Sequence, residues 1–129
     1  MQTTYPDLRH GALSLADEKP LIETTLALLR KAWGQAVRGW LSPAKSESAA
    51  TPDLLRAAGV DYVCDWVNED MPFAMRTDPG VLHAMPHPID MDDTTILVQN
   101  HHTEDDFRDQ LCDQFDMLYR ESATLGGRI

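Results

Sequence analysis

The sequence predicts one α/β domain in which amphipathic helices alternate with short strands. Apolar residues recur at helical spacing in residues 17–33, and strand-like runs flank a second helical pattern at residues 51–59. Two strands joined by a helix lie parallel in the same sheet. With 129 residues, 43% of them hydrophobic, the chain is long enough for one core, so we expect residues 1–129 to form a single domain.

The first helix is expected over residues 17–33, with Gly34 where a helix C-cap falls. Its predicted buried stripe comprises Ile22, Leu26, Leu29 and Trp33. The next segment, QAVRGWLSP, is β-prone and is stopped by Pro43. The small polar segment AKSESAA that follows is typical of a loop. Such a loop either carries functional residues or only connects two elements.

A second helix begins at Thr51, an expected N-cap, with Pro52 at the first helical position and Gly59 as its stop. The run VDYVC is predicted to be a buried strand, and several polar residues follow it. Two more strands are expected in GVLHAMP and TTILVQN. The last helix follows Thr103 as its cap, has a stripe expected to be buried, and stops at Gly126; the stripe comprises Phe107, Leu111, Phe115 and Leu118.

Active groups in α/β folds collect at the carboxyl ends of strands. This rule selects residues 38–42, 65–70 and 100–102, which we expect to converge on one face. The predicted site face comprises Arg38, Trp40, Asp65, Trp66, Asn68, Asp70 and His102.

The catalytic candidates are Arg38, Asp65 and His102. Arg38 can hold a carboxylate, or it can be an exposed side chain beside a core tryptophan. The carboxylates and amide of residues 65–70 can supply a general base or hydrogen-bond a polar substrate, or they can be a solvated turn.

The candidates for substrate binding are Trp40, Trp66, Asn68 and Asp70. Trp66 can form an apolar wall for a sugar or ureide ring, although aromatic residues in strands more often pack in a core. His102 is a candidate substrate contact.

Composition argues against several classes of partner. The formal net charge of -10, from 21 acidic and 11 basic side chains, would repel a phosphate backbone, so no nucleic acid is expected. No apolar run approaches a membrane span and no signal-peptide pattern is visible, so no membrane partner and a cytoplasmic location are expected. No glycine-rich phosphate loop indicates a nucleotide cofactor.

A metal site within the chain is not expected either. Adjacent His101 and His102 point to opposite sides of an extended backbone, and His83 and His87 lack a helix that would bring them together. His10 reads as a solvated surface residue.

The stretch VRGWLSPAKSESAATPDLLRAAGVDYVCDWVNEDMPF resembles the polysaccharide deacetylase (NodB-homology) superfamily, specifically its allantoinase-like branch. The matching motifs are R-G-W-x-x-P, T-P-[DE]-L-L and D-Y-x-x-D-W in this order, and DQFDMLYRESATLGGRI is similar to the same branch. The resemblance assigns Arg38 to the third family motif, and Asp65 and Trp66 to the fourth, which shapes the substrate groove.

The resemblance implies an irregular (β/α) barrel that hydrolyses C–N amide bonds, often with a divalent metal such as zinc. It also places the metal-binding H-x-x-x-H and the base aspartate before the matched segment, and the general-acid histidine beyond GGRI. We therefore expect an incomplete barrel, a central and C-terminal fragment of the domain, that binds no metal itself.

The function expected from the resemblance is amide hydrolysis on a small polar or N-acetylated sugar substrate, without activity in this polypeptide alone. The alternative is a non-catalytic α/β interaction module, or a domain fragment, that forms homo-oligomers or pairs with a partner through exposed sheet edges.

Overall fold

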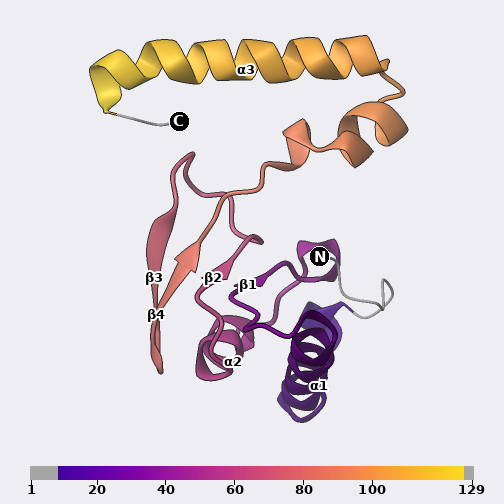
Figure 1. Ribbon diagram of the computed structural model, residues 1–129, viewed down its shortest axis with the longest axis vertical. Helices are drawn as coiled ribbons and strands as arrows, with labels where there is room; N and C mark the ends of the chain where they lie inside the picture. The colour runs from indigo at the N-terminus through magenta and orange to yellow at the C-terminus, as the bar shows by residue number, and fades with distance from the viewer. Residues whose placement is uncertain (1–8, 127–129) are drawn as a thin grey trace. The chain divides into compact units, whose positions relative to one another are not determined.

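The computed structural model describes residues 9–126 and divides into two compact units, with the boundary between Pro86 and His87. The first unit is a mixed α/β structure with an open four-stranded sheet, and the second is helical (Figure 1). The helices and strands of the first unit are α1 (Leu15–Trp33), β1 (Gly39–Trp40), α2 (Thr51–Ala57), β2 (Tyr62–Val63), β3 (Phe73–Thr77) and β4 (Gly80–Ala84), with two 3-10 helices, η1 (His10–Ala12) and η2 (Pro43–Lys45).

The strand order of the sheet is β1-β2-β4-β3. β1 pairs with β2 in parallel, which confirms the predicted β1–α2–β2 connection, and β2 pairs with β4 in parallel. Parallel pairing brings the carboxyl ends of β1 and β2 to the same edge of the sheet. The loops that follow these two strands therefore lie close together.

Both helices of the first unit pack on the sheet through apolar side chains. The core of this unit consists of Ile22, Leu26, Val37, Trp40, Leu55, Val60, Val63 and Leu82. Gly34 ends α1 as expected, with φ at 71° and its N–H donating to the carbonyl of Arg30. The predicted burial of Trp33 is wrong: its side chain is 65% exposed, because it is the last residue of α1 and lies one turn beyond Leu29, which still contacts the core.

The strand β3 was not expected from the sequence. It pairs antiparallel with β4, which lies in the predicted GVLHAMP segment, through a tight turn at Asp78-Pro79. Thr77 Oγ1 donates to the carbonyl of Gly80, whose φ of 139° is open to glycine but not to other residues. The resulting hairpin ends the sheet on the β3 side.

The second unit contains η3 (Ile89–Met91), η4 (Thr94–Gln99) and α3 (Glu104–Leu125). The prediction of a strand at TTILVQN is wrong, since η4 is a π-helix. Asp92 lies two residues before its first residue, Thr94, and bonds its first turn: the Asp92 side chain accepts from the N–H of Thr95 at 2.7 Å, and the Asp92 carbonyl accepts from the N–H of Ile96. β-branched residues favour a strand only where a neighbouring strand exists to pack against, and this local cap favours a helix instead.

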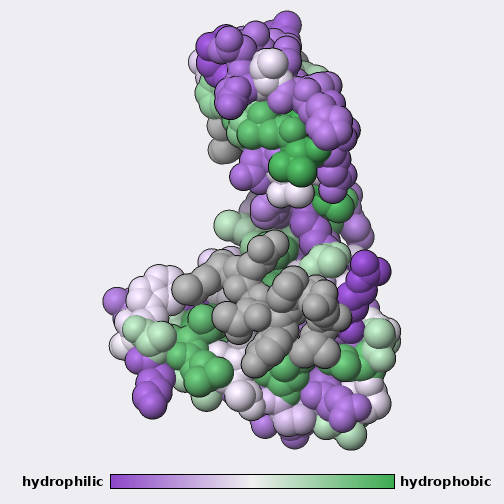
Figure 2. All heavy atoms as spheres, turned by 90° about the vertical axis from the view of Figure 1, so that its right-hand side faces the viewer, coloured by the Kyte–Doolittle hydropathy of each residue, from purple (hydrophilic) through white to green (hydrophobic). Residues whose placement is uncertain are grey.

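The last helix is confirmed, with a capping box in which Thr103 and Asp106 bond each other's backbone N–H. The expected burial of its apolar stripe is wrong, because Leu111 and Phe115 are 43% and 53% exposed. Within its unit this helix packs chiefly on the short η4. In Figure 2, hydrophilic side chains predominate over this part of the chain, and hydrophobic ones gather in a smaller patch.

Of the helices described, none combines the length and the apolar character that crossing a bilayer requires.

Candidate functional site at the carboxyl ends of β1 and β2

Four side chains meet where β1 and β2 end, and we name them the strand-end cluster: Ser42, Glu47, Asp65 and Trp66. Ser42 follows β1, and its backbone N–H donates to Asp65 Oδ1 at 2.8 Å. Asp65 and Trp66 follow β2 directly, while Glu47 comes from the polar loop after η2. The parallel pairing of the two strands thus brings together Ser42 and Asp65, which are 23 positions apart in sequence.

Trp40 supports this cluster from the core and does not line it. Its side chain is only 4% exposed, and its indole N–H donates to Ser42 Oγ at 3.1 Å. The ring of His10 meets Trp40 edge-on, with 5.8 Å between centroids. The structure therefore gives Trp40 a packing role in place of the expected substrate contact, because β1 directs its side chain inward.

Glu47 is held by Trp66, whose indole N–H donates to Glu47 Oε2 at 2.6 Å. Burial raises the pKa of Glu47 to about 8, and the neighbouring carboxyl group of Asp65 adds to the rise. The bond from Trp66 opposes it, and Glu18 adds a weaker contribution in the raising direction. Glu47 is thus a carboxyl group that carries its proton at neutral pH.

Two oxygens of the cluster, Glu47 Oε1 and Asp65 Oδ2, are buried and have no hydrogen-bond partner among the described residues. Glu47, Asp65 and Trp66 also line a cavity of about 240 Å³ together with Lys45. The cavity is therefore lined by a tryptophan, two acidic residues and a lysine. Such a surface can exchange a proton with a polar molecule and pack against its flat face.

A buried polar network fixes the loop that carries Glu47. Glu18, fully buried on α1, bonds His10 Nδ1 at 3.0 Å and accepts from Ser48 Oγ at 2.5 Å. The hydroxyl of Thr51 also donates to Glu18. The expectation that His10 is solvated is wrong, since it is 1% exposed and paired with Glu18.

Thr51 is not the N-cap of α2 but its first residue, with Ala50 at the cap position. Its hydroxyl turns to Glu18 and accepts from the backbone N–H of Ser48 at 2.8 Å. The contacts at residues 48 and 51 therefore anchor the loop immediately after Glu47.

Arg38 lies at the other end of β1. It precedes the strand, its side chain is 73% exposed, and its Nε donates to Asp61 Oδ2 at 2.6 Å. The hydrogen bond and the positive charge of Arg38 hold the pKa of Asp61 below its usual range. Asp61 precedes β2, whereas Asp65 follows it. Arg38 therefore lies at the opposite end of these strands from Asp65, and the expected convergence of the two residues is not found.

Three further candidates are Asn68, Asp70 and His102. Asn68 and Asp70 are exposed in the turn that follows Trp66. His102 belongs to the second unit, where its Nδ1 bonds Gln110 Nε2 at 2.9 Å. Their roles in substrate binding and catalysis stay predictions.

The donor set of the strand-end cluster does not fit the divalent metal that the resemblance implies. It offers two carboxyl groups and no histidine, and one of those groups holds its proton at neutral pH, whereas a metal ligand must be deprotonated. Across residues 9–126 there is no group of three or more His, Cys, Asp or Glu side chains arranged to hold a metal ion.

Glu47 and Glu18 were both missed from the sequence. Glu47 stands in a polar loop directly after a predicted strand, and the carboxyl-end rule, extended by a few residues beyond Ser42, would have selected it. Glu18 gave no comparable signal. It occupies the first turn of a helix, where acidic residues are usually exposed.

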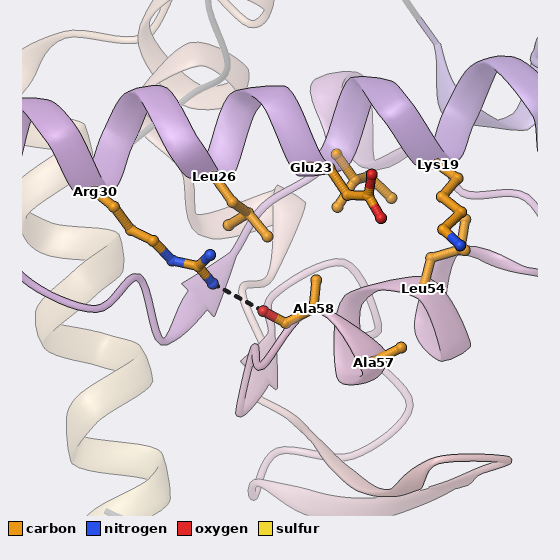
Figure 3. A pocket seen from close by; sticks show the side chains of 8 residues that line it. Lys19, Glu23, Leu26, Arg30, Leu54, Ala57 and Ala58 are labelled. Carbon is orange, nitrogen blue, oxygen red and sulfur yellow. Dashed lines mark hydrogen bonds between the residues drawn. The ribbon is translucent and has the colours of Figure 1, made fainter.

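A second cavity, of about 320 Å³, lies between α1 and α2 (Figure 3). Lys19 extends from α1 toward Leu54 on α2, Glu23 points from α1 into the groove, and Arg30 donates to the carbonyl of Ala58 at 2.8 Å. It is a groove between two packed helices, and its lining includes no residue of the strand-end cluster. We take the strand-end cluster as the candidate site because it combines a cavity with a proton-bearing acid.

The fold of the chain is similar to part of an allantoinase and to part of polysaccharide deacetylases of known structure. The chain is similar to the crystal structure of Puue allantoinase, with 24% identity over 91% of this chain and a TM-score of 0.76. It is also similar to a probable polysaccharide deacetylase from Pseudomonas aeruginosa PAO1, with 22% identity over 91% of this chain and a TM-score of 0.73. The matched region spans 39% and 40% of these two structures.

The resemblance read from the sequence is thus confirmed at the level of the fold. A scan against protein-family models gives no match, and a search of curated proteins gives no significant match.

Proposed function

We propose that this chain is part of a carbon–nitrogen hydrolase that acts on the amide bond of a small polar or N-acetylated sugar substrate. The observation that carries the proposal is the strand-end cluster, in which a protonated Glu47 and an indole wall face a cavity at the carboxyl ends of two parallel strands. The similarity in fold to an allantoinase and to a probable polysaccharide deacetylase supports the same class of reaction.

The cluster suits the two needs of an amide substrate. An amide has a flat group that can pack on the exposed part of Trp66, and its nitrogen must receive a proton before it can leave. Asp65 supplies a fixed acceptor beside that nitrogen, because its Oδ1 is anchored by the N–H of Ser42.

We further propose that the open sheet is a section of an incomplete (β/α) barrel, and that this polypeptide is inactive without the remaining strands. Many members of the superfamily named above use a divalent metal to activate water. No step is assigned to a metal here, because the cluster does not fit one.

Titration calorimetry of the 129-residue chain tests the class of ligand. We expect acetamide, allantoin or N-acetylglucosamine to bind, and glycerol and glucose, which lack an amide, not to bind. Trp66→Ala should weaken binding by about 5- to 150-fold, since a buried aromatic contact and its hydrogen bond contribute about 1–3 kcal/mol. Trp33→Ala, which removes an exposed indole at the end of α1, is the matched control. If no amide binds, or if Trp33→Ala and Trp66→Ala act alike, the proposal is overturned.

A second candidate function is an interaction module that pairs through the sheet edge formed by β3. Within residues 9–126, this strand of five residues has only β4 as a neighbour, and strands at such edges can pair with another chain. A homodimer formed in this way would sediment with twice the mass of the chain at micromolar concentration. A monodisperse monomer over the same range would count against it.

A further inference from the structure

We propose that Gly11 and Glu18 are positioning residues of the candidate site, which hold the loop around Glu47 in place and so fix Glu47 against Trp66. Both act through the loop, and neither is among the residues that line the cavity of the strand-end cluster. The ligand used to test the inference rests on the proposed function, whereas the positioning of Glu47 does not. Neither positioning residue was assigned a role from the sequence.

The loop is bonded to η1 and α1 on both sides of Glu47. Before it, Ser46 Oγ accepts from the backbone N–H of Gly11 at 3.2 Å. After it, Ser48 Oγ donates to Glu18 Oε2 at 2.5 Å. The two pairs are 35 and 30 positions apart in sequence, so these bonds are tertiary contacts and not part of a local turn. The backbone of Glu47 is therefore fixed at the residue before it and at the residue after it.

Gly11 also packs against the loop so closely that no side chain fits at its position. A Cβ there would lie 2.9 Å from the carbonyl oxygen of Glu47 and 2.9 Å from Ser46 Oγ, which is closer than real Cβ atoms approach other atoms. A backbone carbonyl cannot turn aside as a flexible side chain can, so an added methyl group must displace the loop. Gly11 is not one of the glycines with positive φ, so glycine is needed here for close approach and not for backbone conformation.

Glu18 is itself fixed by buried partners. Its side chain is fully buried, its Oε1 is bonded to His10 Nδ1 at 3.0 Å, and the hydroxyl of Thr51 donates to the same oxygen. His10 in turn packs edge-on against Trp40 of the core. Both oxygens of Glu18 are thus engaged. The bond from Ser48 therefore ties the loop to the core of the first unit and not to an exposed side chain.

The side chain of Glu47 carries this constraint to the cavity. Its Oε2 accepts from the indole N–H of Trp66 at 2.6 Å, and both residues line the cavity of about 240 Å³. A displaced loop would take this acceptor away from Trp66 and would move part of the lining. A site that is in place for only a fraction of the time binds its ligand with an apparent Kd raised by the inverse of that fraction. Loss of the contacts at Gly11 or Glu18 should therefore weaken binding at a cavity that neither residue lines.

Gly11→Ala in the full 129-residue chain tests the close approach. We expect the ¹⁵N–¹H signal of the Trp66 indole to move. Calorimetry should show acetamide binding weakened by about 3- to 10-fold, as for a loop that is in place about one third to one tenth of the time. The indole signal of Trp33, exposed at the end of α1, should not move. Ala12→Ser, which adds one atom to the next and exposed residue of η1, is the matched control and should change neither readout.

Ser48→Ala tests the bond to Glu18 without adding volume. It should also move the Trp66 signal and weaken acetamide binding by about 2- to 10-fold, the effect of one lost hydrogen bond on the position of the loop. Ser48→Thr, which keeps the hydroxyl, should restore both. Ser122→Ala, which removes a hydroxyl that donates to the carbonyl of Tyr119 in α3, is the matched control. A role confined to stability would lower the urea midpoint of Ser48→Ala and leave the Trp66 signal and the affinity of the folded protein unchanged.

The outcomes separate this inference from the proposed function. An unchanged Trp66 signal in Gly11→Ala and Ser48→Ala, or an unchanged acetamide affinity in a chain that binds it, would overturn the positioning role while the ligand class stands. Changes in both variants that are absent from both controls and reversed by Ser48→Thr support it. If the wild type binds no acetamide, the proposed function is overturned and the Trp66 signal alone decides the positioning role. If Gly11→Ala does not fold, the comparison of Ser48→Ala with Ser48→Thr decides it.

Discussion

Replacing Glu18 with alanine is expected to lower the free energy of unfolding of the chain by about 3–5 kcal/mol. Glu18 is fully buried and accepts hydrogen bonds from Ser48 and Thr51, and it is paired with His10. Removing the carboxylate leaves these buried polar groups without their partner and leaves a cavity beneath the loop.

Urea unfolding followed by tryptophan fluorescence measures this change, since Trp40 lies in the core against the same network. Glu23→Ala, at an exposed residue of the same helix, is the matched control and should change stability by less than about 0.5 kcal/mol. Glu18→Gln, which keeps the shape of the side chain, should lose less than Glu18→Ala. A loss below about 1 kcal/mol in Glu18→Ala would show that the network does not hold the loop.

The 129-residue polypeptide is expected to release neither acetate from acetylated chito-oligosaccharides nor allantoate from allantoin, with or without added zinc. Amide hydrolysis near neutral pH needs an activated water and a polarised carbonyl as well as a proton for the nitrogen. Glu47 can meet only the last need. Loss of one acid–base group costs about 10²–10⁴-fold in rate, and loss of carbonyl stabilisation costs about a further 10²–10³-fold.

Product release is measured by enzymatic assay for acetate and by chromatography for allantoate. The informative variant is His102→Ala, because His102 is the candidate for a substitute acid in the second unit. Turnover that is well above background and abolished by His102→Ala would contradict the expectation. It would show that the chain is a complete enzyme with a rearranged site.

Local patterns were sufficient to predict the helices and the first pair of strands. Gly34 marked the end of α1, and a helix between two strand-like runs implied that β1 and β2 are parallel, as observed. The strand predicted at TTILVQN was wrong because the β propensity of a segment depends on neighbouring strands. The side chain of Asp92 instead bonds the first turn of a helix there. The β3–β4 hairpin was missed although an Asp-Pro-Gly turn stands between its strands.

The site was predictable only in part. The carboxyl-end rule and the family resemblance both selected Asp65 and Trp66, and the structure brings these two residues to one cavity. Arg38 was assigned to the wrong end of β1. This strand has only two residues, so its start and its end are too close in sequence to tell apart by pattern. Glu47 was missed because the carboxyl-end rule was applied only as far as Ser42, and its burial, which depends on the packing of a loop against residues 65 and 66, could not be predicted.

The central claim, that the strand-end cluster is the ligand site, is tested most directly by mapping where acetamide binds on a ¹⁵N-labelled chain. The account predicts that the indole N–H of Trp66 and the backbone N–H of Ser42 shift with a common saturation curve, while the indole of Trp33 stays unchanged. Shifts confined to the groove between α1 and α2, at Lys19 and Leu54, with Trp66 and Ser42 unmoved, would contradict it.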